Sequence, residues 1–382
     1  MKKICIILPK GLPVPAVKGG AIETLISNLI DVNEEEKKIK ITICATYDKK
    51  AEKKQSLYKY TDFINVKKNF LYIVNSLKSK IKKGNVNTNS EYILEKIKDK
   101  NFDYVIVEGG PQNSFESYKK FFKKDQLILH LHHNEKYSNI AEQTFGRFLF
   151  VSEYIKQDYV KNAKKINCNI IKNGIDINKF MKSDDIIETN ALKEQLEIKK
   201  EDYVLIYCGR LIEGKGVLEL CKAFNLINEK NLKLLIIGSP EFSNNAESEY
   251  TKLIRNEVKK SENKIKLLGY QSNEEIYKYY NIAHLGIVPS KLQEAAGLIV
   301  IEMLLSGLNI LTTGTGGIKE YLGKYGNYIS NDEKIIENLA SEIQQIKNKS
   351  KKEKHKKSER INYAKQFNKY EMYYNLLEIL ER

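Results

Sequence analysis

The segment Ser290–Gly307 has residue types suited to hydrogen-bonding a ligand rich in hydroxyl and anionic groups. It reads SKLQEAAGLIVIEMLLSG and places the carboxylates Glu294 and Glu302 around a small-residue turn and an apolar run. A strand followed by a side-chain-poor turn and a helix exposes backbone N–H groups to an anion. Inside an apolar run, Glu302 is expected to have a hydrogen-bonding task, such as holding vicinal hydroxyls. The alternative is a turn before a buried helix, whose N-terminal acid complements the helix dipole.

Two basic residues, Arg210 and Lys215, stand in the string GRLIEGKG, between an apolar run and a helical pattern. Arginine offers a planar fork of donors and lysine a point charge, a combination that suits a pyrophosphate. Their spacing across a strand–helix junction therefore predicts an anion site.

Glycine-rich loops follow two further apolar runs. Gly19 and Gly20 lie in LPVPAVKGGAIETL, and a second loop reads TTGTGGIKE at 312–320. Such loops let a backbone approach a phosphate or sugar closely and open a helix N-terminus. The alternative for each is a tight turn without a ligand.

Three of the five histidines, His130, His132 and His133, stand together in LILHLHHNE. Strand alternation places the first two on one face and the third on the other. A metal site is the alternative for these histidines, but no acid cluster is spaced along the sequence to complete it, so we expect no metal. The chain also has no Asp-x-Asp pair, no GxSxG and no P-loop motif, which argues against a metal-dependent nucleotide-sugar site, a serine hydrolase and a P-loop NTPase.

Short apolar runs alternate with helical patterns along the whole chain, which predicts a parallel α/β fold in two domains. The predicted strands are 4–8, 41–45, 103–108, 127–131, 148–151, 204–208, 233–237, 264–268, 284–288 and 309–313. The predicted helices are 23–31, 70–83, 91–98, 114–122, 153–161, 216–228, 248–260, 273–279, 298–305 and 335–347. We place an N-terminal domain at 1–170, a C-terminal domain at 171–360, and a tail helix at 361–382 that packs back on the first domain.

The charge balance favours an anionic partner. The chain has a formal charge of +15, and residues 49–100 carry fourteen lysines against five acids. We expect this region to face an anionic membrane surface or acceptor; the alternative is a lysine-rich, solvated surface. Nucleic acid is not expected, because no zinc-ligand spacing or basic-aromatic RNA signature occurs.

The five cysteines form no CxxC pair and are odd in number, which predicts free thiols in a reducing compartment. The N-terminal apolar run is too short for a signal peptide, and no run approaches about 18 apolar residues. We therefore expect a cytoplasmic protein, peripheral on the inner face of the cell membrane.

Taken in order, these segments resemble glycosyltransferases of family 4, which have the GT-B architecture of two facing Rossmann-like domains and a deep interdomain cleft. The N-terminal loop and the HNE at 133–135 are similar to spore-coat and capsule-type members. The other matching strings are IKNGID (171–176), GRLIEGKG (209–216), IIGS (236–239), EAAGLIVIE (294–302) and GGIKE (316–320).

The resemblance implies a role for each matching residue. Gly19 and Gly20 would face the donor diphosphate, Arg210 and Lys215 would neutralise it, and Glu302 would hold the ribose. Glu294 and the amides of Ala296, Gly297 and Leu298 would contact the donor sugar. His133 matches the active-site histidine, with His132 as a close competitor. Two departures, Ala295-Ala296 for the usual Pro-Phe and Lys319 for the usual proline, leave sugar selectivity open.

The resemblance implies a retaining, metal-independent transferase that needs no cofactor. It would move a hexose from a nucleotide-sugar, a UDP-sugar by expectation, to a hydroxyl of a glycan or lipid-linked glycan in cell-surface polysaccharide synthesis. The alternatives are a nucleotide-sugar epimerase of the same architecture, which would convert the donor without an acceptor, and a non-catalytic glycan- or membrane-binding protein.

Overall fold

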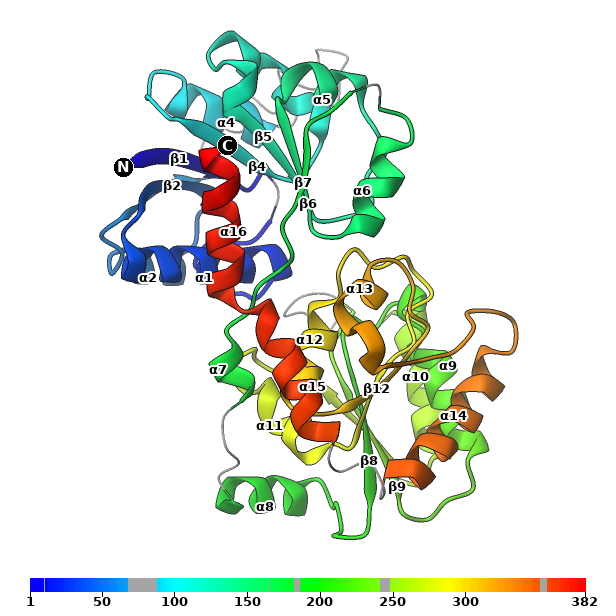
Figure 1. Ribbon diagram of the computed structural model, residues 1–382. Coiled ribbons are helices and arrows are strands. Elements are labelled where there is room, and N and C mark those ends of the chain that lie inside the picture. The colour runs from blue at the N-terminus through cyan, green and yellow to red at the C-terminus, as the bar shows by residue number, and fades with distance from the viewer. Residues whose placement is uncertain (10, 68–87, 164, 182–185, 241–247, 351–355) are drawn as a thin grey trace. The chain divides into compact units, whose positions relative to one another are not determined.

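The computed structural model divides the chain into two compact units, shown in Figure 1. It describes residues 1–9, 11–67, 88–163, 165–181, 186–240, 248–350 and 356–382. The N-terminal unit comprises Met1–Ile175 and Lys369–Arg382, and the C-terminal unit comprises Asp176–Asn368.

The N-terminal unit is built on a seven-stranded parallel sheet in the order β3-β2-β1-β4-β5-β6-β7. Its strands read as continuous apolar runs because helices bury both faces of a parallel sheet. The strands are β1 (Lys2–Ile7), β2 (Ile39–Thr46), β3 (Thr61–Val66), β4 (Tyr104–Glu108), β5 (Leu127–Leu131), β6 (Arg147–Phe150) and β7 (Cys168–Ile170).

Helices α1 and α16 pack together on one face of this sheet, while α4 and the 3₁₀ helix η1 pack together on the other (Figure 1). The helices of this unit are α1 (Ala21–Glu36), α2 (Lys49–Gln55), α4 (Thr88–Ile97), η1 (Gln112–Lys120), η2 (Lys124–Gln126), α5 (Asn139–Thr144), α6 (Glu153–Val160) and α16 (Lys369–Glu381). The predicted helix at 70–83 lies outside the described residues.

The C-terminal unit has a six-stranded parallel sheet in the order β10-β9-β8-β11-β12-β13. Both sheets therefore follow the Rossmann-like order, in which the strand sequence reverses beside the first strand. The strands of this unit are β8 (Tyr203–Cys208), β9 (Leu232–Ile237), β10 (Ile265–Gly269), β11 (Leu285–Val288), β12 (Asn309–Thr312) and β13 (Gly326–Tyr328).

Helices α9, α10 and α14 lie on one side of this sheet and α11, α12 and α15 on the other (Figure 1). The helices of this unit are α7 (Ile177–Phe180), α8 (Ile186–Gln195), η3 (Glu213–Lys215), α9 (Val217–Leu226), α10 (Glu249–Lys260), α11 (Ile276–Ile282), α12 (Leu298–Leu305), α13 (Ile318–Leu322), η4 (Gly323–Tyr325), α14 (Ile335–Ser350), α15 (Lys356–Ala364) and η5 (Lys365–Phe367).

Two parallel Rossmann-like domains confirm the predicted fold class, but the details of the division differ from the prediction. The chain passes from the N-terminal to the C-terminal unit between Ile175 and Asp176, five residues after the predicted boundary. The predicted single tail helix at 361–382 is wrong, because Asn368 has an extended backbone and ends it. Helix α15 packs on α12 of the C-terminal unit, and only α16 packs on α1 of the N-terminal unit.

Different partners hold the two tail helices. At the end of α15, Phe367 packs against Tyr321 with ring centroids 5.1 Å apart. In α16, Met372 and Tyr373 are buried, and the Tyr373 hydroxyl donates a 2.7 Å hydrogen bond to Oδ1 of Asn33 in α1. Asn33 also exchanges hydrogen bonds with the backbone of Ile39 at the start of β2. The C-terminus is therefore part of the N-terminal core.

We predict that Tyr373→Phe lowers the free energy of unfolding of the N-terminal unit by about 0.5–1.5 kcal/mol, the usual net value of one hydrogen bond. Asn33 retains its backbone partner, so the loss stays small. The matched control is Tyr374→Phe on the exposed side of α16, whose hydroxyl bonds Glu36 close to solvent, so its loss should be smaller. Urea unfolding followed by tyrosine fluorescence measures both, and equal losses in the two variants would contradict the assignment.

Candidate functional site

The predicted donor residues gather where the strand order of the C-terminal sheet reverses, between β8 and β11. Arg210 and Lys215 follow β8, and Glu294 follows β11. Ligands of open α/β sheets bind at such a reversal, beyond the carboxyl ends of the strands. Residues that are far apart in the sequence are thus brought to the same edge of one sheet.

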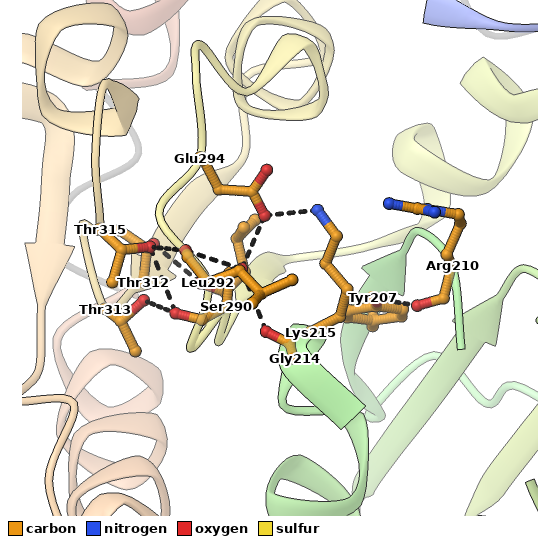
Figure 2. A network of polar contacts seen from close by, with 11 residues as sticks. Tyr207, Arg210, Gly214, Lys215, Ser290, Leu292, Glu294, Thr312, Thr313 and Thr315 are labelled. Carbon is orange, nitrogen blue, oxygen red and sulfur yellow. Dashed lines mark hydrogen bonds and ion pairs between the residues drawn. The ribbon is translucent and has the colours of Figure 1, made fainter. Parts of the chain in front are cut away.

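The Glu294 carboxylate is held by two partners (Figure 2). Lys215 Nζ forms an ion pair with Glu294 Oε1, and Ser290 Oγ donates a 2.6 Å hydrogen bond to the same oxygen. Oε2 has no hydrogen bond among the described residues, so it remains available to a ligand hydroxyl. Both side chains of the ion pair are mostly but not fully buried, so they are held in place and still accessible.

Hydroxyl groups fix the backbone that leads to Glu294. Thr313 Oγ1 donates to the Ser290 carbonyl at 2.6 Å, and Thr315 Oγ1 donates to the Leu292 carbonyl at 2.7 Å, as Figure 2 shows. These threonines belong to the glycine-rich loop after β12. That loop therefore supports the turn that carries Glu294. The sequence alone did not predict this supporting role.

Two glycines allow the loops to pack this closely. A Cβ on Gly316 would lie 2.1 Å from the Glu294 carbonyl oxygen, and a Cβ on Gly216 would lie 2.0 Å from the Pro289 carbonyl oxygen. Both residues also have positive φ. The Gly317 N–H completes the contact by donating to the Glu294 carbonyl at 2.8 Å. Larger residues at these positions would force the loops apart.

Arg210 is exposed, and its side chain points toward that of Lys215 in Figure 2. Its backbone carbonyl accepts a 2.9 Å hydrogen bond from the Tyr207 hydroxyl. Among the described residues the guanidinium has no ion-pair partner. The strand end thus fixes the Arg210 backbone and leaves its charge free for an anion.

Helix α12 starts within the same segment. Gly297 has φ +82° and precedes the first helical residue, Leu298, while Ala296 is buried. One turn further along, Glu302 Oε2 accepts a 3.0 Å hydrogen bond from Tyr280. Burial raises the pKa of Glu302 to about 7, against the smaller lowering effects of Tyr280 and the charge of Lys179.

Lys319, which replaces the proline of the family pattern, lies 5.4 Å from the centroid of the Tyr328 ring. Its aliphatic stem also passes close to Gly314. Its observed partner is therefore an aromatic ring.

Gly19 and Gly20 belong to the N-terminal unit, in the loop between β1 and α1. A Cβ on Gly20 would lie 2.1 Å from Oε2 of Glu23, and Glu23 Oε1 accepts a 2.8 Å hydrogen bond from the Leu12 N–H. Burial raises the pKa of Glu23. The sequence analysis missed this carboxylate, although GGAIE places it in the first turn of the expected helix.

The two competing histidines have different surroundings. His133 is exposed, whereas His132 is buried and its Nε2 lies 2.6 Å from Glu108 Oε2. His130 Nδ1 lies 2.9 Å from the same carboxylate oxygen. The sequence shows no acid close to these histidines, but β4 and β5 are paired in a register that sets Glu108 opposite His130.

This cluster shifts the acidity of its members. Burial tends to raise the pKa of Glu108, but the charge and hydrogen bonds of His130 and His132 outweigh it and lower the pKa to about 2. Burial lowers the pKa of His132 to about 4, with a further lowering by His130 and an opposing effect of Glu108. At neutral pH Glu108 is therefore ionised and His132 is neutral.

Residues 188–367 match the family model described as glycosyl transferases group 1. The C-terminal unit is a glycosyl transferases group 1 domain. The region 188–367 includes all the candidate donor-site residues from Arg210 to Glu302. The chain is 27% identical over 58% of its length to lipopolysaccharide 1,2-N-acetylglucosaminetransferase of Salmonella typhimurium, spanning 57% of that relative.

Two further similarities cover the whole chain. Spore coat protein SA of Bacillus subtilis is 22% identical over 100% of this chain and 99% of its own length. The crystal structure of Anabaena Alr3699/HepE in complex with UDP and glucose superposes with a TM-score of 0.77, 18% identity and full coverage of both chains. The two domains therefore have the GT-B fold. Within the described ranges, no helix is both long and apolar enough to span a bilayer.

We predict that Glu302→Gln raises the thermal midpoint of the C-terminal unit relative to wild type at pH 8 but not at pH 5. A carboxyl that ionises near 4.5 when unfolded and at about 7 when folded binds its proton more tightly in the native state. Its ionisation therefore costs stability as the pH rises toward and through 7, and glutamine avoids this cost.

Scanning calorimetry at both pH values measures the difference. The control is Glu333→Gln, an exposed acid, whose effect should not depend on pH. If Glu302→Gln changes the thermal midpoint by the same amount at pH 5 and at pH 8, the raised pKa is contradicted.

Proposed function

We propose that this chain is a retaining, metal-independent hexosyltransferase of family 4. It takes a nucleotide-sugar of the UDP class and transfers the hexose to a hydroxyl of a glycan or lipid-linked glycan in cell-surface polysaccharide synthesis. The observation that carries the proposal is the Lys215–Glu294 ion pair at the strand-order reversal of the C-terminal sheet, with Arg210 in the same loop after β8. The names of the lipopolysaccharide relative and of the UDP complex support the acceptor and donor classes.

The chemistry follows from the charges of the site. Negative charge develops on the diphosphate as its bond to the sugar breaks, and preorganised cations stabilise it. Arg210 offers a guanidinium without an ion-pair partner among the described residues. Lys215 is already held over the site by Glu294, so it can share its charge with the arriving diphosphate. These two cations carry the positive charge that the leaving group needs.

The sugar and ribose would be held by carboxylates and backbone amides. Glu294 Oε2 would accept from a sugar hydroxyl, with the amides of Ala296, Gly297 and Leu298 beside it. Glu302 would accept from the ribose once it is ionised. From the N-terminal unit, Gly19 and Gly20 would approach the diphosphate and His133 would face the reacting sugar. A departing phosphate oxygen would take the acceptor's proton.

A selective thermal shift is the first expected outcome. UDP or its sugar conjugate should raise the thermal midpoint more than the GDP or ADP equivalents, because only a ligand that binds the native state stabilises it. The rise in thermal midpoint that the nucleotide causes should be the same with EDTA as without added metal. Differential scanning fluorimetry across this panel tests it. No shift with any nucleotide would favour the non-catalytic binding protein.

Arg210→Ala and Lys215→Ala should each weaken the binding of that nucleotide by about 1.5–3 kcal/mol, or roughly 10- to 150-fold, the usual value of a charge-assisted hydrogen bond. Isothermal titration calorimetry measures the loss. Lys222→Ala, an exposed lysine on α9, is the matched control and should bind as wild type does. Unchanged affinity in both site variants would show that the site is misassigned.

Product analysis separates transfer from epimerisation. With the donor alone, a transferase gives only slow hydrolysis, whereas an epimerase gives a new nucleotide-sugar. With an acceptor, nuclear magnetic resonance of the anomeric proton should show retention of configuration. An inverted product would refute the retaining mechanism.

The lysine-rich region at 49–100 would place the protein on the inner face of the cell membrane, from the cytoplasmic side. In helix α2, Lys49, Lys50, Lys53 and Lys54 are exposed. Attraction of such lysines to anionic lipid is worth about 1 kcal/mol each near the surface and is screened by salt. We expect liposomes containing phosphatidylglycerol to sediment the protein at low salt. Equal sedimentation with neutral liposomes would contradict the membrane role.

A further inference from the structure

The carboxyl edge of the N-terminal sheet holds a second group of chemically active side chains. Glu108 ends β4, His130 lies opposite it in β5, and His132 follows β5 directly (Figure 1 labels both strands). One donor atom from each side chain can be chosen so that all three lie within 4.8 Å of one another. All three side chains are buried.

We propose that Glu108, His130 and His132 form a binding site for a divalent transition-metal ion of the zinc class. Two imidazoles and one carboxylate are a ligand set that suits zinc and not magnesium or calcium, which prefer oxygen ligands alone. The site is independent of the proposed donor chemistry, which rests on Arg210 and Lys215 in the other unit.

The spacing of the donor atoms is close to what zinc requires. Glu108 Oε2 lies 2.9 Å from His130 Nδ1 and 2.6 Å from His132 Nε2. Ligands at the usual zinc distances, arranged as a tetrahedron, lie about 3.3 Å apart. The two contacts therefore have to lengthen by about 0.4 and 0.7 Å, and the ion would replace the ring protons through which the imidazoles can donate to the carboxylate.

Two further observations indicate room for a small polar ligand beside this cluster. His130 is 8% exposed, yet its Nε2 has no hydrogen-bond partner among the described residues. Buried polar atoms in native proteins nearly always have a partner, which is often a water or an ion. A cavity of about 20 Å³ adjoins all three side chains, walled by apolar residues of α1 and α16. That volume holds about one water molecule, the usual fourth ligand of an open zinc site.

Cobalt(II) titration tests the proposal, because four-coordinate cobalt absorbs visible light strongly and occupies zinc sites. The full chain, stripped with a chelator, should bind one equivalent of cobalt, and zinc should then displace it. Glu108→Gln, His130→Gln and His132→Gln should each weaken binding by at least about 100-fold, the upper range for loss of even a supporting partner. His133→Gln, next in sequence but outside the cluster, should retain the full spectrum.

The absence of a cobalt spectrum in wild type, or a spectrum that survives all three substitutions, would overturn the proposal. Thermal unfolding without metal shows whether each variant folds. If they do not fold, X-ray absorption of the zinc-loaded wild type decides the question. Two imidazoles and oxygen around the ion support the site, whereas a sulfur shell from the free cysteines refutes it.

Discussion

The ion pair between Lys215 and Glu294 joins loops that are 79 residues apart in the chain, and the candidate donor site depends on it. It forms because β8 and β11 are neighbours at the point where the strand order reverses. A partly exposed pair of this kind adds little to stability. Its importance is positional: together with Ser290, it leaves one carboxylate oxygen and one shareable cation facing the place where a sugar diphosphate would bind.

Close backbone packing makes this arrangement possible. Gly216 lies against the Pro289 carbonyl and Gly316 lies against the Glu294 carbonyl, at distances that no side chain would permit. Loops that follow three different strands are therefore locked together without large side chains. Ala295 and Ala296 also have small side chains, so the region beside Glu294 is shaped chiefly by backbone atoms.

The two sheets share a strand order but carry different chemistry at the same edge. In the C-terminal unit, cations and carboxylates lie at the reversal, in partly exposed positions. In the N-terminal unit, the equivalent edge of β4 and β5 holds a buried carboxylate between two imidazoles. Common topology thus determines where functional groups gather, and the local residues determine whether they meet a substrate or are enclosed in the core.

The sequence by itself determined the α/β class and most of the strands, because apolar runs in buried parallel strands are local patterns, and it named the candidate residues of the donor site. Its prediction of β5 and α12 agrees with the structure to the residue. It gave no bounds for β3 and missed β7 and β13, where polar residues interrupt the apolar pattern. It also joined α15 and α16, since both are amphipathic and nothing local shows that they pack on different units.

Only the tertiary structure decided which distant residues meet. The pairing of β4 with β5 set Glu108 beside His130, 22 residues along the chain, and packing buried His132 while leaving His133 exposed. Strand register and burial arise from contacts between segments that are remote in sequence. Local residue patterns therefore indicate which residues could be functional, and only the folded sheet shows which of them lie close together.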